Sequence, residues 1–206
     1  IITVPATLSP TATPQEILNW LPRYLSAVLA VAVLTGIISW VIGNIAAGIA
    51  IKFTSDTLEN GKANLLTSFN FTMSRLLSIL AVSIITGILI VIGLIALVIP
   101  GIILAIMFSL VVPAIIIENI GALESLSRSR LLVSHRWLKT FGLLLLLYII
   151  IGIVSLIISV ITSPFGLVGP LVSSILAAFI QPILPIGLTL YYYSMIARAT
   201  LPPPQN

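Results

Sequence analysis

The chain contains no cysteine, a single histidine and few charged residues. The lack of cysteine excludes disulfides, thiolate metal sites and cysteine nucleophiles, and one histidine cannot build a His-rich or di-metal site. Only 7% of the 206 residues are charged, against about a quarter in ordinary globular chains. Because 59% of the residues are apolar, the composition indicates an integral membrane protein, and we expect no cofactor.

Long apolar stretches separated by polar or proline-containing segments dominate the rest of the chain. A membrane-spanning helix needs about 20 apolar residues, and five stretches reach or approach that length. We therefore predict an all-α fold, a polytopic transmembrane helix bundle with about five spans and two cytoplasmic amphipathic connecting helices. The predicted spans are 25–51, 76–99, 102–117, 141–162 and 171–196. They form a single membrane domain, 25–199, between an exoplasmic connector at 1–24 and a tail at 200–206.

Proline and glycine set several boundaries in the first half of the chain. Pro14 and the prolines before it prevent a continuous helix at the start, and Thr11 or Thr13 is expected to cap a short helix around 15–20. Gly61 is predicted to stop a helix in the connector 52–75. Pro100-Gly101 predicts a tight turn, because one helix through both neighbouring spans would reach about 63 Å. Pro113 is expected to kink the third span.

The last two spans are also divided by proline. Ser163-Pro164 ends the fourth span, and Pro170, Pro182 and Pro185 interrupt the apolar stretch that follows. One kinked crossing is favoured there over a re-entrant pair of short helices. The tyrosines at 191–193 are predicted to mark a membrane interface.

A few small or polar residues lie inside the spans. Gly43 and Ala47 form a small-xxx-small pair that allows close helix approach. Asn44, Ser155 and Gln181 are candidates for intramembrane polar contacts, Asn44 through an interhelical hydrogen bond or contact with a solute. No Asp, Glu, Lys, Arg or His lies in the interior of any span, which counts against proton-driven pumps.

The connector 118–140 carries four of the nine basic residues. On a helical wheel it is amphipathic, with Glu124 and Arg128 on one side and Leu123, Val133 and Trp137 on the other. Glu124 and Arg128 have favourable i,i+4 spacing, and Glu118 is expected to cap a helix or pair with an arginine. Anionic lipid headgroups are the predicted partners, with a docking surface for a cytoplasmic protein as the alternative. The residues predicted to lie at this membrane interface are Arg128, Arg130, Arg136, Trp137 and Lys139.

The distribution of charge predicts the orientation. The two connectors hold seven of the nine Lys and Arg residues, whereas the turns near 100 and 163 hold none. The positive-inside rule then places the connectors 52–75 and 118–140 in the cytoplasm of a multi-pass protein of the cytoplasmic (plasma) membrane. This pattern does not fit nucleic-acid binding, where a basic soluble module is expected. An exoplasmic start without a signal sequence suggests that a further span precedes Ile1.

A signature runs through the middle of the chain: a Pro-Gly turn, a span ending in Pro-Ala and an acidic residue, Gly-Ala-Leu-Glu, a basic-Ser pair and a late tryptophan. Its residues are Pro100, Gly101, Pro113, Ala114, Glu118, Gly121, Ala122, Leu123, Glu124, Arg128, Ser129 and Trp137. The pattern resembles the membrane domain of the glycerophosphoryl diester phosphodiesterase family and related uncharacterised prokaryotic membrane proteins. Ser125 stands where that family usually has alanine. The resemblance implies a six-helix membrane domain, of which this chain would carry the last five spans, but no hydrolase activity, because the catalytic residues belong to a separate soluble domain.

These observations predict a non-catalytic integral membrane protein, a scaffold or accessory component of the cytoplasmic membrane. The alternative is a small transporter or flippase-like protein for lipid or another amphipathic solute, with the broken helix near Pro182 lining its path. An intramembrane enzyme is a distant third. Ser134 and His135 are adjacent, and adjacent helical side chains point about 100° apart, so we expect no nucleophile-base pair there.

Overall fold

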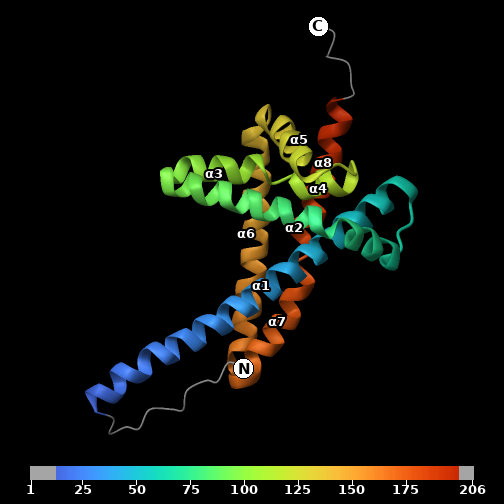
Figure 1. The fold of residues 1–206 in the computed structure, drawn as a ribbon. Helices are drawn as coiled ribbons and strands as arrows, with labels where there is room; N and C mark the ends of the chain where they lie inside the picture. Colours follow the sequence, from blue (N-terminus) through green and yellow to red (C-terminus); the bar gives the residue numbers. More distant parts are fainter. Residues whose placement is uncertain (1–12, 200–206) are drawn as a thin grey trace. The chain divides into compact units, whose positions relative to one another are not determined.

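The computed structural model describes residues 13–199, which form helices and contain no strand (Figure 1). The all-α prediction is therefore confirmed. Five segments are long and apolar enough to cross a membrane: Pro14–Asn60, Leu65–Ala96, Val98–Ile117, Trp137–Gly166 and Gly169–Ala197. The chain divides into two compact units, Ile1–Gly43 and Asn44–Asn206. Part of the predicted connector 1–24 and all of the predicted tail 200–206 lie outside the described residues.

Helix α1 (Pro14–Asn60) is one continuous helix of 47 residues. Thr13 starts it with a capping box, in which its backbone N–H donates to Glu16 Oε2 (2.8 Å) and its hydroxyl accepts from the Glu16 N–H (3.4 Å). At 1.5 Å per residue α1 is about 70 Å long, more than twice a bilayer core. The helix therefore extends beyond both ends of the predicted span 25–51, and the bounds of the span within it stay a prediction. Gly61, with φ +68°, follows the last helical residue as predicted.

Helices α2 (Leu65–Ala96) and α3 (Val98–Met107) pack against each other as a hairpin. Asn64 caps α2, its side-chain oxygen accepting from the Leu66 and Thr67 amides at 2.8 and 3.3 Å. The predicted hairpin is confirmed, but its turn is centred on Leu97, and Pro100 and Gly101 lie inside α3. Gly101 instead permits close packing: a Cβ at Gly93 would lie 2.9 Å from the Gly101 Cα. The second half of the connector 52–75 is the start of α2.

The third span is broken, as Pro113 predicted. Helix α3 ends at Met107 and α4 (Val111–Ile117) begins after a turn at Phe108–Leu110. A proline has no N–H, and its ring crowds the carbonyl four residues earlier, here that of Ser109. A continuous helix would bring the Pro113 ring against this carbonyl. The helix is instead broken at Phe108–Leu110, and Pro113 lies in the first turn of the next helix.

The second connector is not one helix. Residues 118–121 form a bend that includes Asn119 at φ 56°, followed by α5 (Ala122–Ser134) and a second turn at His135–Arg136. The buried residues of α5 are Ser125, Ser129 and Val133, whereas Leu123 is exposed. The predicted wheel placed Leu123 on the apolar side together with Val133. In the structure the buried face of α5 instead contains Val133 and the two serines, and Leu123 lies outside it.

The chain ends in α6 (Trp137–Thr162), the 3₁₀ helix η1 (Ser163–Val168), α7 (Gly169–Ile180) and α8 (Ile183–Ala199). The predicted break at Ser163-Pro164 is confirmed. Both α7 and α8 pack against α6 (Figure 1), and they do not pair extensively with each other. The two helices together form one apolar segment, Gly169–Ala197, which is broken at Gln181-Pro182 and is long enough for a single crossing.

Two clusters of buried apolar residues hold the second unit together. The first joins α3, α4, α5 and α8 through residues that include Leu110, Val133 and Tyr192. The second joins the end of α1 to α2 and α4 through Ile51, Ile79 and Ile115. The short helix α4 contributes to both clusters, so it is the centre of the packing.

Candidate functional site

The most charged contact near the core lies at the junction of α4 and α5. The Arg128 Nε donates to both Glu118 carboxylate oxygens at 2.9 Å, and its Nη2 donates to Oε1 at 2.7 Å. Hydrogen bonding to the carboxylate raises the pKa of Arg128. The predicted ion pair between Glu118 and an arginine is confirmed, and Arg128 uses Glu118 rather than Glu124. Glu124 lies exposed in the first turn of α5, where a negative charge favours the helix dipole.

Ser129 closes the break between α3 and α4. Its hydroxyl donates to the Met107 carbonyl at 2.6 Å and accepts from the Leu110 N–H at 3.3 Å. These backbone groups lie at a helix end and at a helix start, where the helix itself provides no partner. Ser129 is fully buried, so the second residue of the basic-Ser pair satisfies the backbone at this break from inside the protein.

The remaining signature residues also have structural positions. Pro113 lies in the first turn of α4, Gly101 packs against α2, and Pro100 lies in the first turn of α3. Gly121 is the N-cap of α5 with extended backbone, φ −75° and ψ 168°. The signature therefore describes how α2 to α5 turn and pack.

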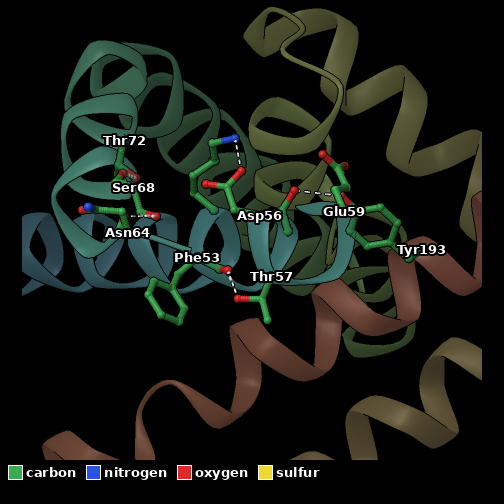
Figure 2. Close-up of polar contacts among 10 residues, drawn as sticks. Phe53, Asp56, Thr57, Glu59, Asn64, Ser68, Thr72 and Tyr193 are labelled. Carbon is green, nitrogen blue, oxygen red and sulfur yellow. Dashed lines mark hydrogen bonds and ion pairs between the residues drawn. The ribbon is translucent and has the colours of Figure 1, made fainter. Parts of the chain in front are cut away.

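The tyrosines of α8 attach this helix to its neighbours. Tyr192 is completely buried in the first cluster, and the Tyr191 hydroxyl lies 3.0 Å from the Thr140 hydroxyl on α6. Tyr193 lies 2.7 Å from the Ser55 hydroxyl and donates to Glu59 Oε1, both on α1 (Figure 2). The prediction that all three mark a membrane interface is wrong for Tyr192, because its ring has no exposed surface.

Sequence reasoning missed the polar contacts around the end of α1. Beside Tyr193, the Lys52 ammonium lies 2.7 Å from Asp56 Oδ1 and 4.7 Å from the centre of the Phe71 ring. Figure 2 shows Asp56 and Glu59 on neighbouring turns of α1. The i,i+4 spacing of Lys52 and Asp56 would have indicated the ion pair. Nothing local to the sequence indicated a partner more than 130 residues away.

The basic residues predicted at the membrane interface separate into three environments. Arg128 is paired with Glu118, and Arg130 is exposed on α5. Arg136, Trp137 and Lys139 lie together at the corner between α5 and α6, where they line a hollow of about 500 Å³ with His135 and Leu138. Trp137 stacks on Phe141 with ring centres 5.9 Å apart.

The three intramembrane polar candidates do not meet. Asn44 Oδ1 accepts from the Ser83 hydroxyl at 2.7 Å, which joins α1 to α2 as predicted. Ser155 lines a hollow of about 250 Å³ between α6 and α7 with Ser159, Ser173 and Ser174. Gln181 is exposed at the break between α7 and α8. A Cβ at Gly43 would meet nothing within 4 Å, whereas a Cβ at Gly48 would lie 2.5 Å from Thr72 Cγ2, so a close approach occurs at Gly48.

Side chains suited to metal or nucleophilic chemistry are sparse in the described part of the chain. No three His, Cys, Asp or Glu residues among 13–199 could hold a metal ion. Ser134 Oγ and His135 Nδ1 lie 3.0 Å apart, so these neighbours do contact, contrary to the expectation from helical spacing. The contact forms because His135 lies in the turn that ends α5. The serine hydroxyl also donates to the Leu131 carbonyl, as a structural serine does at a helix end.

Comparison with known proteins identifies a family for this chain. A family model described as a domain of unknown function, DUF7847, matches residues 14–191. No curated protein and no solved structure matches the chain. The matched region contains all five apolar helical segments except the last residues of α8. The chain is therefore a member of the DUF7847 family.

Proposed function

We propose that this protein is a non-catalytic scaffold or accessory component of the cytoplasmic membrane. The observation that supports this proposal is the use of polar side chains inside the second unit. Ser129 satisfies the backbone at the α3–α4 break, Asn44 joins α1 to α2, and Thr140 contacts Tyr191 between α6 and α8. Interhelical hydrogen bonds of this kind hold membrane helices together.

The proposed orientation places the connectors 52–75 and 118–140 in the cytoplasm. Their basic residues then lie beside the anionic leaflet, where each Lys or Arg near the surface contributes about 1 kcal/mol of attraction. The resemblance to the membrane domain of glycerophosphoryl diester phosphodiesterases extends this proposal to a shared helical scaffold. Accessibility of single cysteines introduced at Lys62 and Ser163 to a membrane-impermeant thiol reagent tests the orientation, and labelling of Lys62→Cys from outside intact cells would contradict it.

A transporter or flippase for an amphipathic solute is the second candidate. The serine-lined hollow between α6 and α7 supports it, because four hydroxyl-bearing residues gather there between two apolar helices. Ser173 and Ser174 both donate to the Pro170 carbonyl, at 2.9 and 2.8 Å, so their protons are already used locally. This use favours the scaffold over a solute path.

Reconstitution into liposomes containing labelled lipids distinguishes the two functions. A scaffold leaves the rate of lipid movement between leaflets at the value of protein-free liposomes. Lipid movement that depends on the protein and falls in a Ser155→Val/Ser174→Val variant would establish transport and overturn the scaffold proposal. The matched control is Ser127→Val on α5, an exposed serine outside the hollow.

A further inference from the structure

We propose that the corner between α5 and α6 is a binding site for the phosphate group of an anionic lipid. This inference rests on the proposed function, since it names the leaflet component to which the scaffold binds. The site is the hollow of about 500 Å³ lined by His135, Arg136, Trp137, Leu138 and Lys139, here called the corner site.

The charges at the corner site are of one sign. Arg136 is half-buried, Lys139 is exposed, and the first turn of α6 contains no acidic residue. Both described ion pairs of the chain lie elsewhere, between Lys52 and Asp56 and between Arg128 and Glu118. Arg136 and Lys139 are therefore cations without a carboxylate partner, in a hollow that a phosphate group can enter.

Backbone donors at the same place also lack acceptors. Arg136 is the N-cap of α6 and provides no side-chain cap. The Arg136 N–H donates back to Val133 and the Thr140 N–H donates to Arg136, which leaves the amides of Trp137, Leu138 and Lys139 without a described acceptor. The N-terminus of a 26-residue helix also carries a partial positive charge, so its free amides favour an anion.

The indole of Trp137 is an independent sign of a missing acceptor. Its Nε1 is shielded from solvent, and no hydrogen-bond partner lies near it among the described residues. A buried donor without an acceptor costs free energy, and Trp137 lines the hollow itself. Because this atom is shielded and the ring packs against the first cluster, an oxygen-rich group bound in the corner site would reach the donor after the indole turns toward the hollow.

The neighbouring apolar surface favours a lipid as the carrier of the phosphate. Leu138 is 72% exposed and Phe141 is 38% exposed, and both belong to the first turns of α6, next to the cations. A phosphate carried by a lipid would keep its acyl chains on this surface. A free phosphate would leave these side chains without a partner.

The corner site contains fewer residues than the predicted membrane interface. Of the five residues predicted at the interface, only Arg136, Trp137 and Lys139 line the corner site. Arg128 is held by Glu118, and Arg130, although exposed, does not line the hollow. Arg130 therefore provides a control of equal charge on the same connector.

The test uses the full chain in phosphatidylcholine vesicles with a minor fraction of spin-labelled phosphatidylglycerol, in which protein-bound label is measured. The Arg136→Gln/Lys139→Gln variant is expected to lower the relative affinity for phosphatidylglycerol about tenfold, because charge-assisted hydrogen bonds to phosphate are lost. Arg130→Gln/Lys62→Gln, which removes the same number of charges outside the hollow, is expected to change it less than about twofold. Trp137→Phe keeps the ring, removes the N–H donor and is expected to weaken binding by a smaller factor.

Two outcomes would overturn the inference. Equal losses in the two double variants would mean diffuse attraction to the leaflet and no corner site. Complete displacement of the label by inorganic phosphate would show a site for free phosphate rather than lipid. Circular dichroism and the unfolding midpoint in dodecyl sulfate identify a variant that has not folded, and Trp137→Phe then serves as the test. Neither outcome involves lipid movement between leaflets, so failure here is distinct from failure of the proposed scaffold function.

Discussion

The third and fourth apolar segments differ sharply in burial although both are long and apolar enough to cross a membrane. Of the 18 consecutive residues that are most apolar in each segment, 44% are buried inside the protein in Val98–Ile117 and 6% in Trp137–Gly166. The buried segment is the broken one, with a turn, a proline and a serine from α5 at its centre. Breaks in a membrane helix are tolerated where protein surrounds them, because lipid offers no hydrogen-bond partners. The comparison teaches that irregular backbone marks the centre of this protein and that the unbroken α6 faces outward.

The largest expected effect is loss of packing at the centre. Leu110→Ala removes a side chain with no exposed surface, and we expect a loss of about 2–5 kcal/mol in the free energy of unfolding. Leu156→Ala, on the outer surface of α6 at 66% exposure, is expected to change it by less than about 0.5 kcal/mol. Unfolding in dodecyl sulfate, followed by circular dichroism, measures both. Similar losses of stability in Leu110→Ala and Leu156→Ala would contradict the difference in burial between the two segments.

Glycine substitutions give the next effect. Gly101→Ala would place a Cβ 2.7 Å from the Leu94 backbone nitrogen, so the α2–α3 hairpin must open, at a cost of about 1–3 kcal/mol. Gly152→Ala on α6 meets nothing within 4 Å and is expected to stabilise that helix by up to about 1 kcal/mol, because alanine is the better helix former. If Gly101→Ala lowers the free energy of unfolding and Gly152→Ala raises it in the same assay, the difference in packing between the two segments is supported. A stabilised Gly101→Ala variant would contradict the close packing of the hairpin.

A smaller effect is expected from the serine that closes the α3–α4 break. Ser129→Ala removes the hydroxyl that donates to the Met107 carbonyl and accepts from the Leu110 N–H. We expect a loss of about 1–2 kcal/mol in the free energy of unfolding, because both backbone groups lose their partner. Faster hydrogen exchange of the Leu110 amide would locate the effect at the break. Ser127→Ala, an exposed serine on the same helix, is the control. Unchanged exchange at Leu110 would mean that Ser129 does not hold the break.

The smallest effect is expected at the ion pair. Arg128→Gln breaks the contact with Glu118, but both side chains keep about a quarter or more of their surface exposed, 31% and 24%. Solvent screens such a pair, so we expect a loss of about 1 kcal/mol or less. Glu118→Gln should give a similar loss, and Arg130→Gln none. A loss as large as that of Leu110→Ala would show that the pair is a main support of the α4–α5 bend.

Several local features could be predicted because neighbouring residues decide them. Thr13 and Glu16 cap α1, Gly61 follows the end of that helix, and Pro113 accompanies the break in the third span. Other predictions from spacing failed. The wheel for 118–140 assumed one helix and put apolar residues inward, but in a membrane protein an exposed leucine contacts lipid at little cost. Ser125 and Ser129 therefore turn inward, where their size and hydroxyls suit the packing.

At the candidate site, too, the sequence indicated the kind of residue involved, and the structure showed the partners. Basic residues on the second connector indicated attraction to an anionic surface, and Glu118 was expected to pair with an arginine. Only the structure shows that Arg128 is the partner, that Arg136 and Lys139 share a hollow, and that the Trp137 indole lacks an acceptor. The contacts of Tyr193 with Ser55 and Glu59 had no local signal.

By itself the sequence determined the membrane class, the helical fold and the number of apolar segments, because these follow from the length and composition of each stretch. It also determined where α1 and α6 stop, since glycine and proline act on the backbone beside them. The tertiary structure decided which segment lies at the centre and which serine or arginine finds a partner. These outcomes depend on contacts between residues far apart in the chain, and apolar residues give no indication of inside or outside when lipid is the solvent.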